Sequence, residues 1–153
     1  MKKPYFPPQQ GAPPPLRMVV RRHVRFEECD PMGIVWHGRY PSYLEDARVA
    51  LGSRCGIGYE DFIRHGVPAP IRRMQIDYLA PLRFREEFSV EAILHWSDGA
   101  RLDYEFLIRG ADDGLAATGC SVQLMLDPAG ELLLVPPPFV RAMRGQWQAG
   151  TLR

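Results

Sequence analysis

The residues with the clearest chemical potential lie near the N-terminus, around one carboxylate in a short loop. Cys29-Asp30-Pro31-Met32-Gly33 has the pattern of a strand end followed by a tight turn, and the apolar spacing after Arg39 is that of a helix. A helix N-terminus carries backbone N–H groups without intrahelical acceptors, and these favour negative charge. An aspartate facing such an end would place a nucleophile or a general base opposite an oxyanion site. That combination suits attack on an acyl carbonyl.

A long amphipathic helix is predicted directly after this loop. Pro41 fits the first helical turn, where the N–H that proline lacks has no acceptor in any case. Gly56 fits the left-handed position that ends a helix. From residue 40 onward, apolar side chains recur at helical spacing, as Tyr40, Tyr43, Leu44, Ala47 and Leu51. One mainly apolar side over about four turns predicts that this helix packs against a sheet.

Strand-like segments lie on both sides of this helix. Residues 19–28 alternate, which places Val20, Val24 and Phe26 on one predicted buried face. After the helix we expect strands at 73–79, 87–96, 102–108 and 116–126, a short apolar run at 132–135, and short helices at 59–65 and 139–144. Strands grouped after a helix indicate an α+β protein with an antiparallel sheet. One helix covers only one face of such a sheet, so the other face must be solvated or buried against a partner.

Length and composition limit the class of protein. A chain of 153 residues with a net charge of +1 predicts one domain and no nucleic-acid partner. Three cysteines without paired spacing predict a reducing, cytoplasmic location. No apolar run approaches the ~18 residues of a membrane span. Residues 1–16 hold six of the fifteen prolines and are expected to form an extended, poorly ordered tail rather than a secretory signal. Residues 17–146 are the predicted domain, and 147–153 a C-terminal tail.

The segment from Phe26 to Arg48 resembles the signature of the 4-hydroxybenzoyl-CoA thioesterase-like family of hotdog-fold acyl thioesterases. That signature has an aromatic residue, a short polar stretch, Asp-x-x-Gly with aliphatic residues after it, an aromatic and a histidine or tyrosine, and a tyrosine opening the helix. The matching residues are Phe26, Asp30, Gly33, Ile34, Val35, Trp36, His37 and Tyr40. Residues 77–82, Asp-Tyr-Leu-Ala-Pro-Leu, look like the family's strand end, an aromatic followed by proline.

The resemblance implies a fold, an assembly and a reaction. The fold is the hotdog fold, in which a curved antiparallel sheet wraps a long central helix. The assembly is a homodimer or a dimer of dimers (a homotetramer), with active sites at the dimer interface. The reaction is hydrolysis of an acyl-CoA or acyl-carrier-protein thioester. No metal ion is implied, and no cofactor apart from the coenzyme A or phosphopantetheine that belongs to the substrate.

The resemblance also suggests catalytic residues. Asp30 is the candidate nucleophile or general base; the competing interpretation is an ordinary turn aspartate, since Asp-Pro commonly begins turns. His37 is the candidate oxyanion donor through its backbone N–H. The His37 imidazole could orient the substrate or donate a proton, or could be a half-exposed side chain without a role. Gly38 is grouped with the catalytic residues and Gly33 with the substrate-binding residues, because both can let an acyl group approach the backbone.

Four further residues are candidates for substrate binding. Trp36 and Tyr40 could line an acyl pocket, although aromatic residues at helical spacing are more often plain core. Arg83 and Arg101 could contact coenzyme A phosphates or an acidic carrier protein, or could belong to a solvated rim. Relatives that use coenzyme A can carry a basic cluster at the position of Arg101. This chain has one arginine and an added acid there.

Some alternatives remain open. Glu45 is a reserve carboxylate, because another branch of hotdog thioesterases takes its catalytic acid from the helix; the competing interpretation pairs Glu45 with Arg48 or Arg39. The alternative function is a non-catalytic hotdog dimer that binds acyl-pantetheine. A third, a dehydratase of 3-hydroxyacyl thioesters, would need a histidine in the approach to the helix together with a helix acid. Asp30 placed before Gly33 fits thioester cleavage better.

Overall fold

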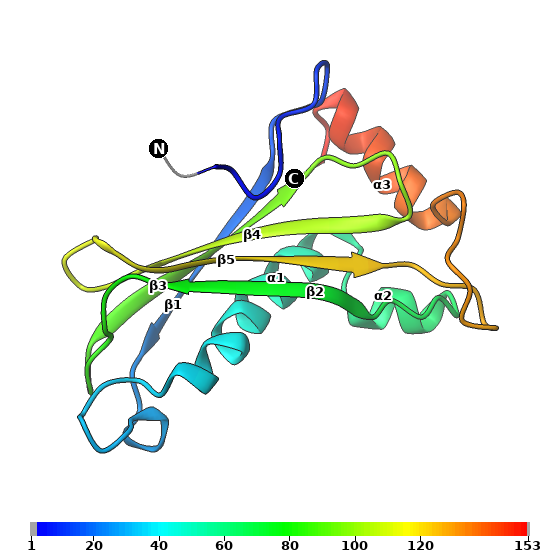
Figure 1. The fold of residues 1–153 in the computed structure, drawn as a ribbon. Helices are drawn as coiled ribbons and strands as arrows, with labels where there is room; N and C mark the ends of the chain where they lie inside the picture. Colours follow the sequence, from blue (N-terminus) through cyan, green and yellow to red (C-terminus); the bar gives the residue numbers. More distant parts are fainter. Residues whose placement is uncertain (1–2, 153) are drawn as a thin grey trace.

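One antiparallel sheet and one long helix dominate the fold (Figure 1). The computed structural model describes residues 3–152. Within them the sheet has five strands in the order β1-β3-β4-β5-β2. Their bounds are β1 Leu16–His23, β2 Ile71–Tyr78, β3 Glu87–His95, β4 Arg101–Arg109 and β5 Leu115–Leu124. Strands β3, β4 and β5 are consecutive antiparallel neighbours, whereas β2 lies at the edge beside β5 and β1 pairs with β3. The α+β prediction is confirmed.

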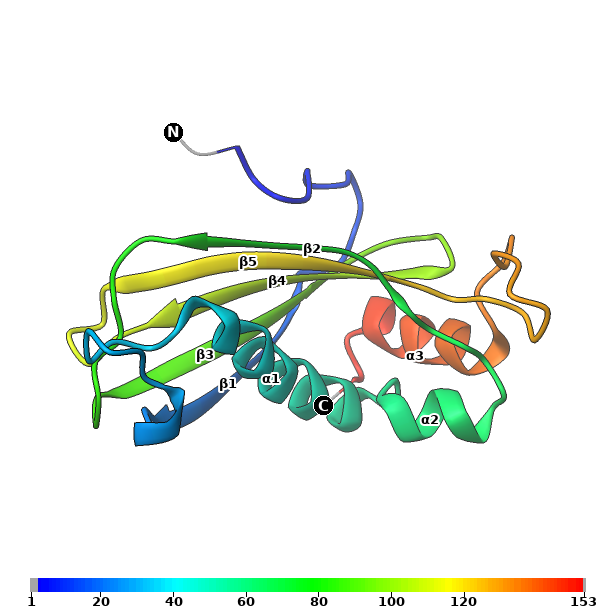
Figure 2. The ribbon, with the colours of Figure 1, turned by 60° about the horizontal axis from the view of Figure 1, so that its bottom comes forward.

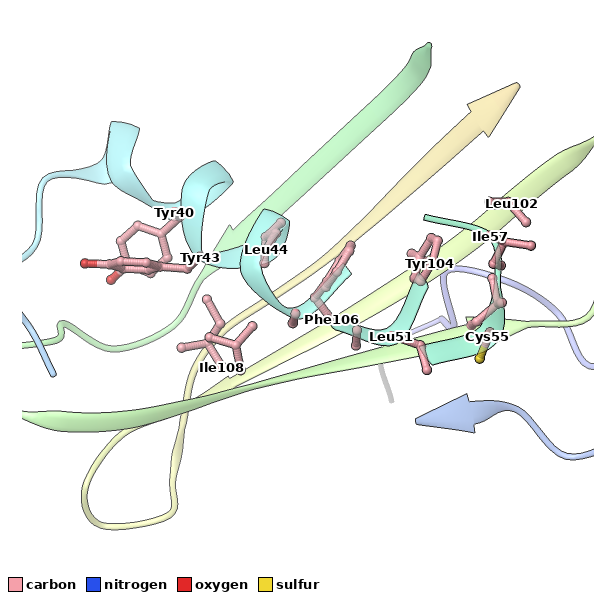
Figure 3. Close-up of a cluster of buried hydrophobic side chains, with 14 of the residues drawn as sticks. Tyr40, Tyr43, Leu44, Leu51, Cys55, Ile57, Leu102, Tyr104, Phe106 and Ile108 are labelled. Carbon is pink, nitrogen blue, oxygen red and sulfur yellow. The ribbon is translucent and has the colours of Figure 1, made fainter. Parts of the chain in front are cut away.

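Helix α1 (Tyr40–Cys55) lies along one face of the sheet (Figure 2). Pro41 stands in its first turn, and Gly56 ends it with a φ of 73° in the left-handed region, as the sequence predicts. The predicted apolar side of α1 is buried and lies over inward side chains of β4 (Figure 3). Tyr43 also meets Phe88 of β3, with the ring centroids 4.7 Å apart. The sheet curves around this helix, as expected for a hotdog fold.

Two boundaries differ from the sequence prediction. Strand β1 ends at His23, and residues Phe26–Glu28 form a 3₁₀ turn (η1) instead of continuing the strand. The Glu28 carboxylate accepts the Arg25 backbone N–H at 2.8 Å, which stabilises this turn. The Phe26 side chain is consequently 80% exposed rather than buried. The apolar run at 132–135 forms only an isolated bridge, between Leu126 and Leu132.

Two short helices complete the fold at the far end of α1. Helix α2 spans Tyr59–Arg64, close to its predicted range. Helix α3 spans Pro138–Ala149 and is longer than predicted, so part of the expected C-terminal tail is helical. Trp147 is buried there and meets Trp96 edge to face, with the ring centroids 5.1 Å apart. In the part of the chain that the structure covers, no helix has the length and apolar character of a membrane span.

The N-terminal segment, residues 3–15, lies across the outer face of the sheet, opposite α1 (Figure 2). Phe6 is buried against Cys120 and Val122 of β5. The Trp147 indole N–H donates a hydrogen bond to the Pro14 carbonyl at 2.8 Å. This packing differs from the expected poorly ordered tail, because Phe6 supplies an apolar anchor for the segment. The predicted tails also include residues 1, 2 and 153, which lie outside the described residues.

Phe6→Ala is expected to loosen the middle of this segment without unfolding the domain. A buried phenylalanine contributes about 2 kcal/mol through removal of its apolar surface from water, whereas the hydrogen bonds of Tyr5 with Asp77 and Thr118, and of Pro14 with Trp147, hold the segment on either side of Phe6. The measurement is limited proteolysis of residues 3–15 together with the melting temperature. Gln10→Ala, at an exposed position of the same segment, is the control. Equal resistance to proteolysis in Phe6→Ala and the parent would show that Phe6 is not the anchor.

Candidate active site

A tight turn fixes the position of Asp30. The Asp30 N–H donates to the Ile34 carbonyl at 2.8 Å, and the Gly33 N–H donates to the Asp30 carbonyl at 3.0 Å. The Asp30 Oδ1 atom accepts the Met32 N–H at 2.8 Å. Gly33 has a φ of 78°, a left-handed conformation that glycine adopts without strain. The turn therefore holds the half-buried Asp30 carboxylate in a defined position.

A second copy of this turn lies elsewhere in the chain. In Asp127-Pro128-Ala129-Gly130, the Asp127 N–H donates to Glu131 at 2.8 Å and the Gly130 N–H donates to Asp127 at 2.9 Å. The Asp127 Oδ1 atom accepts the Ala129 N–H at 2.9 Å, as Asp30 does with Met32. The turn alone thus accounts for an aspartate at either position. A function for Asp30 must come from what surrounds it.

A pocket of about 410 Å³ lies beside Asp30. It is bounded by the Asp30 turn, the entrance to α1 and the segment that follows β2. Its polar groups include Asp30, His37, Tyr40 and Tyr78; apolar side chains form much of the rest, Met32, Ile34, Val35, Leu79, Ala80 and Pro81. Asp127 is not among these residues. A carboxylate at the edge of a mainly apolar pocket, next to a helix start, can act on an acyl group placed there.

The entrance to α1 is a 3₁₀ turn, η2 (His37–Arg39), that leads directly into the helix. The first N–H groups of such a turn have no acceptor within the helix. The carbonyl of His37 accepts a hydrogen bond from the Tyr78 hydroxyl at 2.7 Å. The structure therefore brings Asp30, His37 and Tyr40, three of the candidate site residues, together around one pocket.

The two pocket tyrosines are neutral at physiological pH. Burial, with a smaller effect from Tyr78, raises the pKa of Tyr40 to about 12. Burial also raises the pKa of Tyr78. The two rings meet edge to face with their centroids 4.9 Å apart. Both phenols can therefore donate hydrogen bonds, and neither adds negative charge beside Asp30.

The positions of Trp36, Gly33 and Gly38 fit their predicted roles only in part. Trp36 is 48% exposed and does not line the pocket. A Cβ atom built on Gly38 would lie 2.3 Å from the Trp36 ring, so the absent side chain of Gly38 makes room for this indole. Gly33 is exposed, and its Cβ position meets nothing within 4 Å. Its positive φ accounts for the glycine there.

Neither predicted phosphate contact lines the pocket, although Arg83 lies beside it. Arg83 is exposed and forms an isolated bridge with Ile34, and its N–H donates to the Glu86 carboxylate at 2.8 Å. Arg101 pairs with Leu124 in the sheet register, whereas the Tyr78 end of the sheet pairs with Ala117. Arg101 therefore stands at the end of β4 away from the pocket, where its side chain pairs with Asp103 at 2.7 Å.

Glu45 faces a buried arginine rather than the pocket. Its carboxylate accepts hydrogen bonds from Arg48 and, at 3.0 Å, from the Tyr59 hydroxyl. Arg48 is 4% exposed and also donates to Gln123 Oε1 at 3.1 Å. The ion pair with Arg48, one of the two interpretations of Glu45, is thus present in the structure.

Tyr78, Leu79 and Pro81 line the pocket, and the sequence analysis did not assign them to the site. The available signal was the strand-end sequence at residues 77–82. An aromatic residue there is followed two residues later by Ala80-Pro81, which ends the strand beside the Asp30 turn.

Cys29 precedes Asp30, and its thiol is a poor nucleophile. Desolvation, together with the Asp30 and Glu28 carboxylates, raises the pKa of this thiol. Since the thiolate is the reactive form, Cys29 stays protonated at neutral pH. Cys29→Ser is expected to keep thioester hydrolysis within about twofold of the parent, and the rate of iodoacetamide alkylation at Cys29 should rise only at strongly alkaline pH. Loss of hydrolysis in Cys29→Ser would give the thiol a role.

Comparisons with known proteins agree with this geometry. The model of the Thioesterase-like superfamily matches residues 24–143. A Bacillus subtilis (strain 168) protein with the provisional name acyl-CoA thioesterase YneP is 31% identical over 104 residues, covering 68% of this chain and 75% of that protein.

Solved structures share the fold. A DHNA-CoA thioesterase from Staphylococcus aureus has a TM-score of 0.77 at 22% identity, covering 87% of this chain and 91% of that chain. The hypothetical protein TT1821 from Thermus thermophilus has a TM-score of 0.74 at 28% identity, covering 90% of this chain and 98% of that chain. The family match includes the Asp30 turn, helix α1 and strand β2. The chain therefore belongs to the Thioesterase-like superfamily of hotdog-fold proteins, as its resemblance predicts.

Proposed function

We propose that this protein hydrolyses acyl thioesters, with Asp30 as the reacting carboxylate. The observation that carries the proposal is the shared pocket: the Asp30 carboxylate and the entrance of α1 border the same apolar volume. An acyl group bound there would have its carbonyl between a base or nucleophile and a helix N-terminus. The names of relatives, among them Acyl-CoA thioester hydrolase YbgC of Escherichia coli O157:H7, support the same chemistry.

Two routes are compatible with this arrangement. In one, an Asp30 oxygen attacks the carbonyl carbon, the C–S bond breaks to release the thiol, and water hydrolyses the resulting anhydride. In the other, Asp30 takes a proton from a water molecule while that water attacks the carbonyl; the C–S bond of the resulting tetrahedral intermediate then breaks, and the departing sulfur takes the proton back from Asp30. In both, negative charge develops on the carbonyl oxygen, and the backbone N–H of His37 is its proposed donor. Such a donor is worth roughly 2.7–4 kcal/mol of transition-state stabilisation.

The proposed substrate is an acyl-CoA or an acyl-carrier-protein thioester, and the proposed assembly is a homodimer or a dimer of dimers. Exposed apolar side chains near the pocket support contact with a second copy, namely Phe26, Met32, Leu79 and Phe84. Edge strand β2 offers a further surface for pairing. The free thiols of Cys29, Cys55 and Cys120 fit the proposed cytoplasmic location.

The test of this function is release of free thiol from a panel of aliphatic and aromatic acyl-CoAs and from an acyl-carrier protein. Turnover of at least one member supports the proposal. Tight binding of acyl-CoA without turnover would replace it with the non-catalytic binding function. The mass of the protein in solution, measured by light scattering, tests the assembly, and a monomer at micromolar concentration would contradict it.

A further inference from the structure

Tyr78 connects the end of strand β2 to the entrance of α1. It is the last residue of β2, and its hydroxyl donates a hydrogen bond to the His37 carbonyl at 2.7 Å. Its ring contacts Tyr40 edge to face and forms part of the pocket wall. Although 41 residues separate them in sequence, Tyr78 and His37 are thus linked across the mouth of the proposed site.

The other contacts of the turn that Tyr78 reaches come from nearby residues: the His37 ring meets the Trp36 ring, and the Ser42 hydroxyl donates to the Arg39 carbonyl at 2.7 Å. His37, Gly38 and Arg39 are all exposed, so packing restrains them weakly. The Arg39 N–H donates to the Trp36 carbonyl at 2.9 Å, and the Arg39 guanidinium donates to the Glu27 carbonyl at 3.0 Å. These two bonds tie the turn to the preceding loop. The Tyr78 hydroxyl ties it to the sheet, which is the rigid part of the fold.

The Tyr78 hydroxyl donates to a backbone carbonyl, that of His37, and this choice of acceptor affects the neighbouring N–H. The carbonyl of His37 and the N–H of Gly38 belong to one planar peptide group, so fixing the direction of the carbonyl also fixes the direction of that N–H. A hydrogen bond accepted by a peptide carbonyl also polarises the same peptide and strengthens its N–H as a donor. A hydroxyl placed on this carbonyl therefore acts on the Gly38 N–H, which neighbours the His37 N–H at the helix entrance.

We propose that Tyr78 is a positioning residue that orients the His37–Gly38 peptide, so that the Gly38 N–H serves beside the His37 N–H as a second donor for the developing oxyanion. This inference rests on the proposed function. Tyr78 itself does not touch the reacting atoms in this role. Because the ring of Tyr78 is 51% exposed, its contribution lies in the hydroxyl more than in packing.

The test is Tyr78→Phe in the full-length protein, which keeps the ring and removes the hydroxyl. We expect kcat to fall about tenfold with KM changed by less than about twofold, the pattern of an interaction that matters in the transition state. The melting temperature should change little. The amide resonance of Gly38 in the NMR spectrum should shift, and its hydrogen exchange should become faster.

Tyr5→Phe is the matched control. The Tyr5 hydroxyl forms hydrogen bonds with Asp77 of β2 and Thr118 of β5 on the outer face of the sheet. Asp77 directly precedes Tyr78 on β2. This variant removes a phenol contact to β2 without touching the pocket, and kcat should stay at the parent value.

The outcomes separate the inference from the function. A parent that hydrolyses thioesters and a Tyr78→Phe variant with the parent's kcat would overturn the inference, as would an equal loss in Tyr5→Phe. A parent without turnover would overturn the proposed function, and the Gly38 amide would then still report whether Tyr78 orients this peptide. An unchanged Gly38 amide would overturn the orienting role in either case.

Discussion

Asp30→Asn is expected to reduce thioester hydrolysis by about two to four orders of magnitude, the usual contribution of a general base or nucleophile. An amide neither takes a proton from water nor attacks a carbonyl carbon at neutral pH. The fold should survive, because the Asn Oδ1 atom can accept the Met32 N–H that Asp30 Oδ1 accepts now at 2.8 Å. The measurement is free thiol release under saturating substrate, with the melting temperature recorded for both proteins.

Asp127→Asn is the matched control for this prediction. Asp127 occupies the same Asp-Pro-x-Gly turn with the corresponding hydrogen bonds, its Oδ1 atom additionally accepts the Glu131 N–H at 3.0 Å, and it does not line the pocket. Any general effect of an asparagine in this turn would therefore be visible in both variants. Full turnover in Asp30→Asn would eliminate Asp30 as the reacting group. Equal losses in the two variants would assign the effect to the turn.

These two turns also show what the sequence can and cannot predict about the site. Asp30-Pro31-Met32-Gly33 and Asp127-Pro128-Ala129-Gly130 have the same local pattern and adopt the same local structure. Local chemistry therefore predicts each turn correctly. The difference between them comes from the packing of α1 and of the β2 end beside Asp30. The residues of the turn do not predict that packing, and only the resemblance to a family indicated it.

The helix and the strands were predictable because their signals are local. Pro41 and Gly56 mark the two ends of α1, and the alternation in residues 87–96 marks β3 almost to the residue. Phe26 continues the alternation of β1 in sequence, yet the chain has already turned there. Residues 26–28 form a 3₁₀ turn instead of continuing the strand, and the Glu28 carboxylate stabilises this turn by accepting the Arg25 N–H. The alternation of apolar residues carries no information about such a contact.

The placement of long side chains was less predictable. Trp36 covers Gly38 instead of lining the pocket, because an indole beside a glycine can fold back over the backbone. Arg101 lies at the wrong end of its strand for the pocket of this chain, which follows from the sheet register. Tyr78 reaches the His37 carbonyl only because β2 is the edge strand next to the entrance of α1. Each of these depends on tertiary geometry and not on residue type.

Glu45→Ala is expected to lower the free energy of unfolding by roughly 2–3 kcal/mol, because it removes the carboxylate that neutralises a buried guanidinium. The Arg48 side chain is 5% exposed, and without Glu45 its partners are the neutral Gln123 and Tyr59. The 36% exposure of Glu45 keeps the loss below that of a fully buried pair. In a chain of this length the melting temperature should fall by about 5–10 °C, measured by thermal and denaturant unfolding.

Asp46→Ala tests whether this loss depends on the burial of the partner. Asp46 is the next residue of α1, and it pairs with Arg22, whose side chain is 25% exposed. Water screens that pair, so its removal should change stability by no more than about 1 kcal/mol. If Glu45→Ala matched the parent in stability but lost thioester hydrolysis, Glu45 would be the catalytic carboxylate. If it loses stability and the folded fraction hydrolyses thioesters at the parent rate, the Arg48 pair explains why a carboxylate stands at this position of the helix.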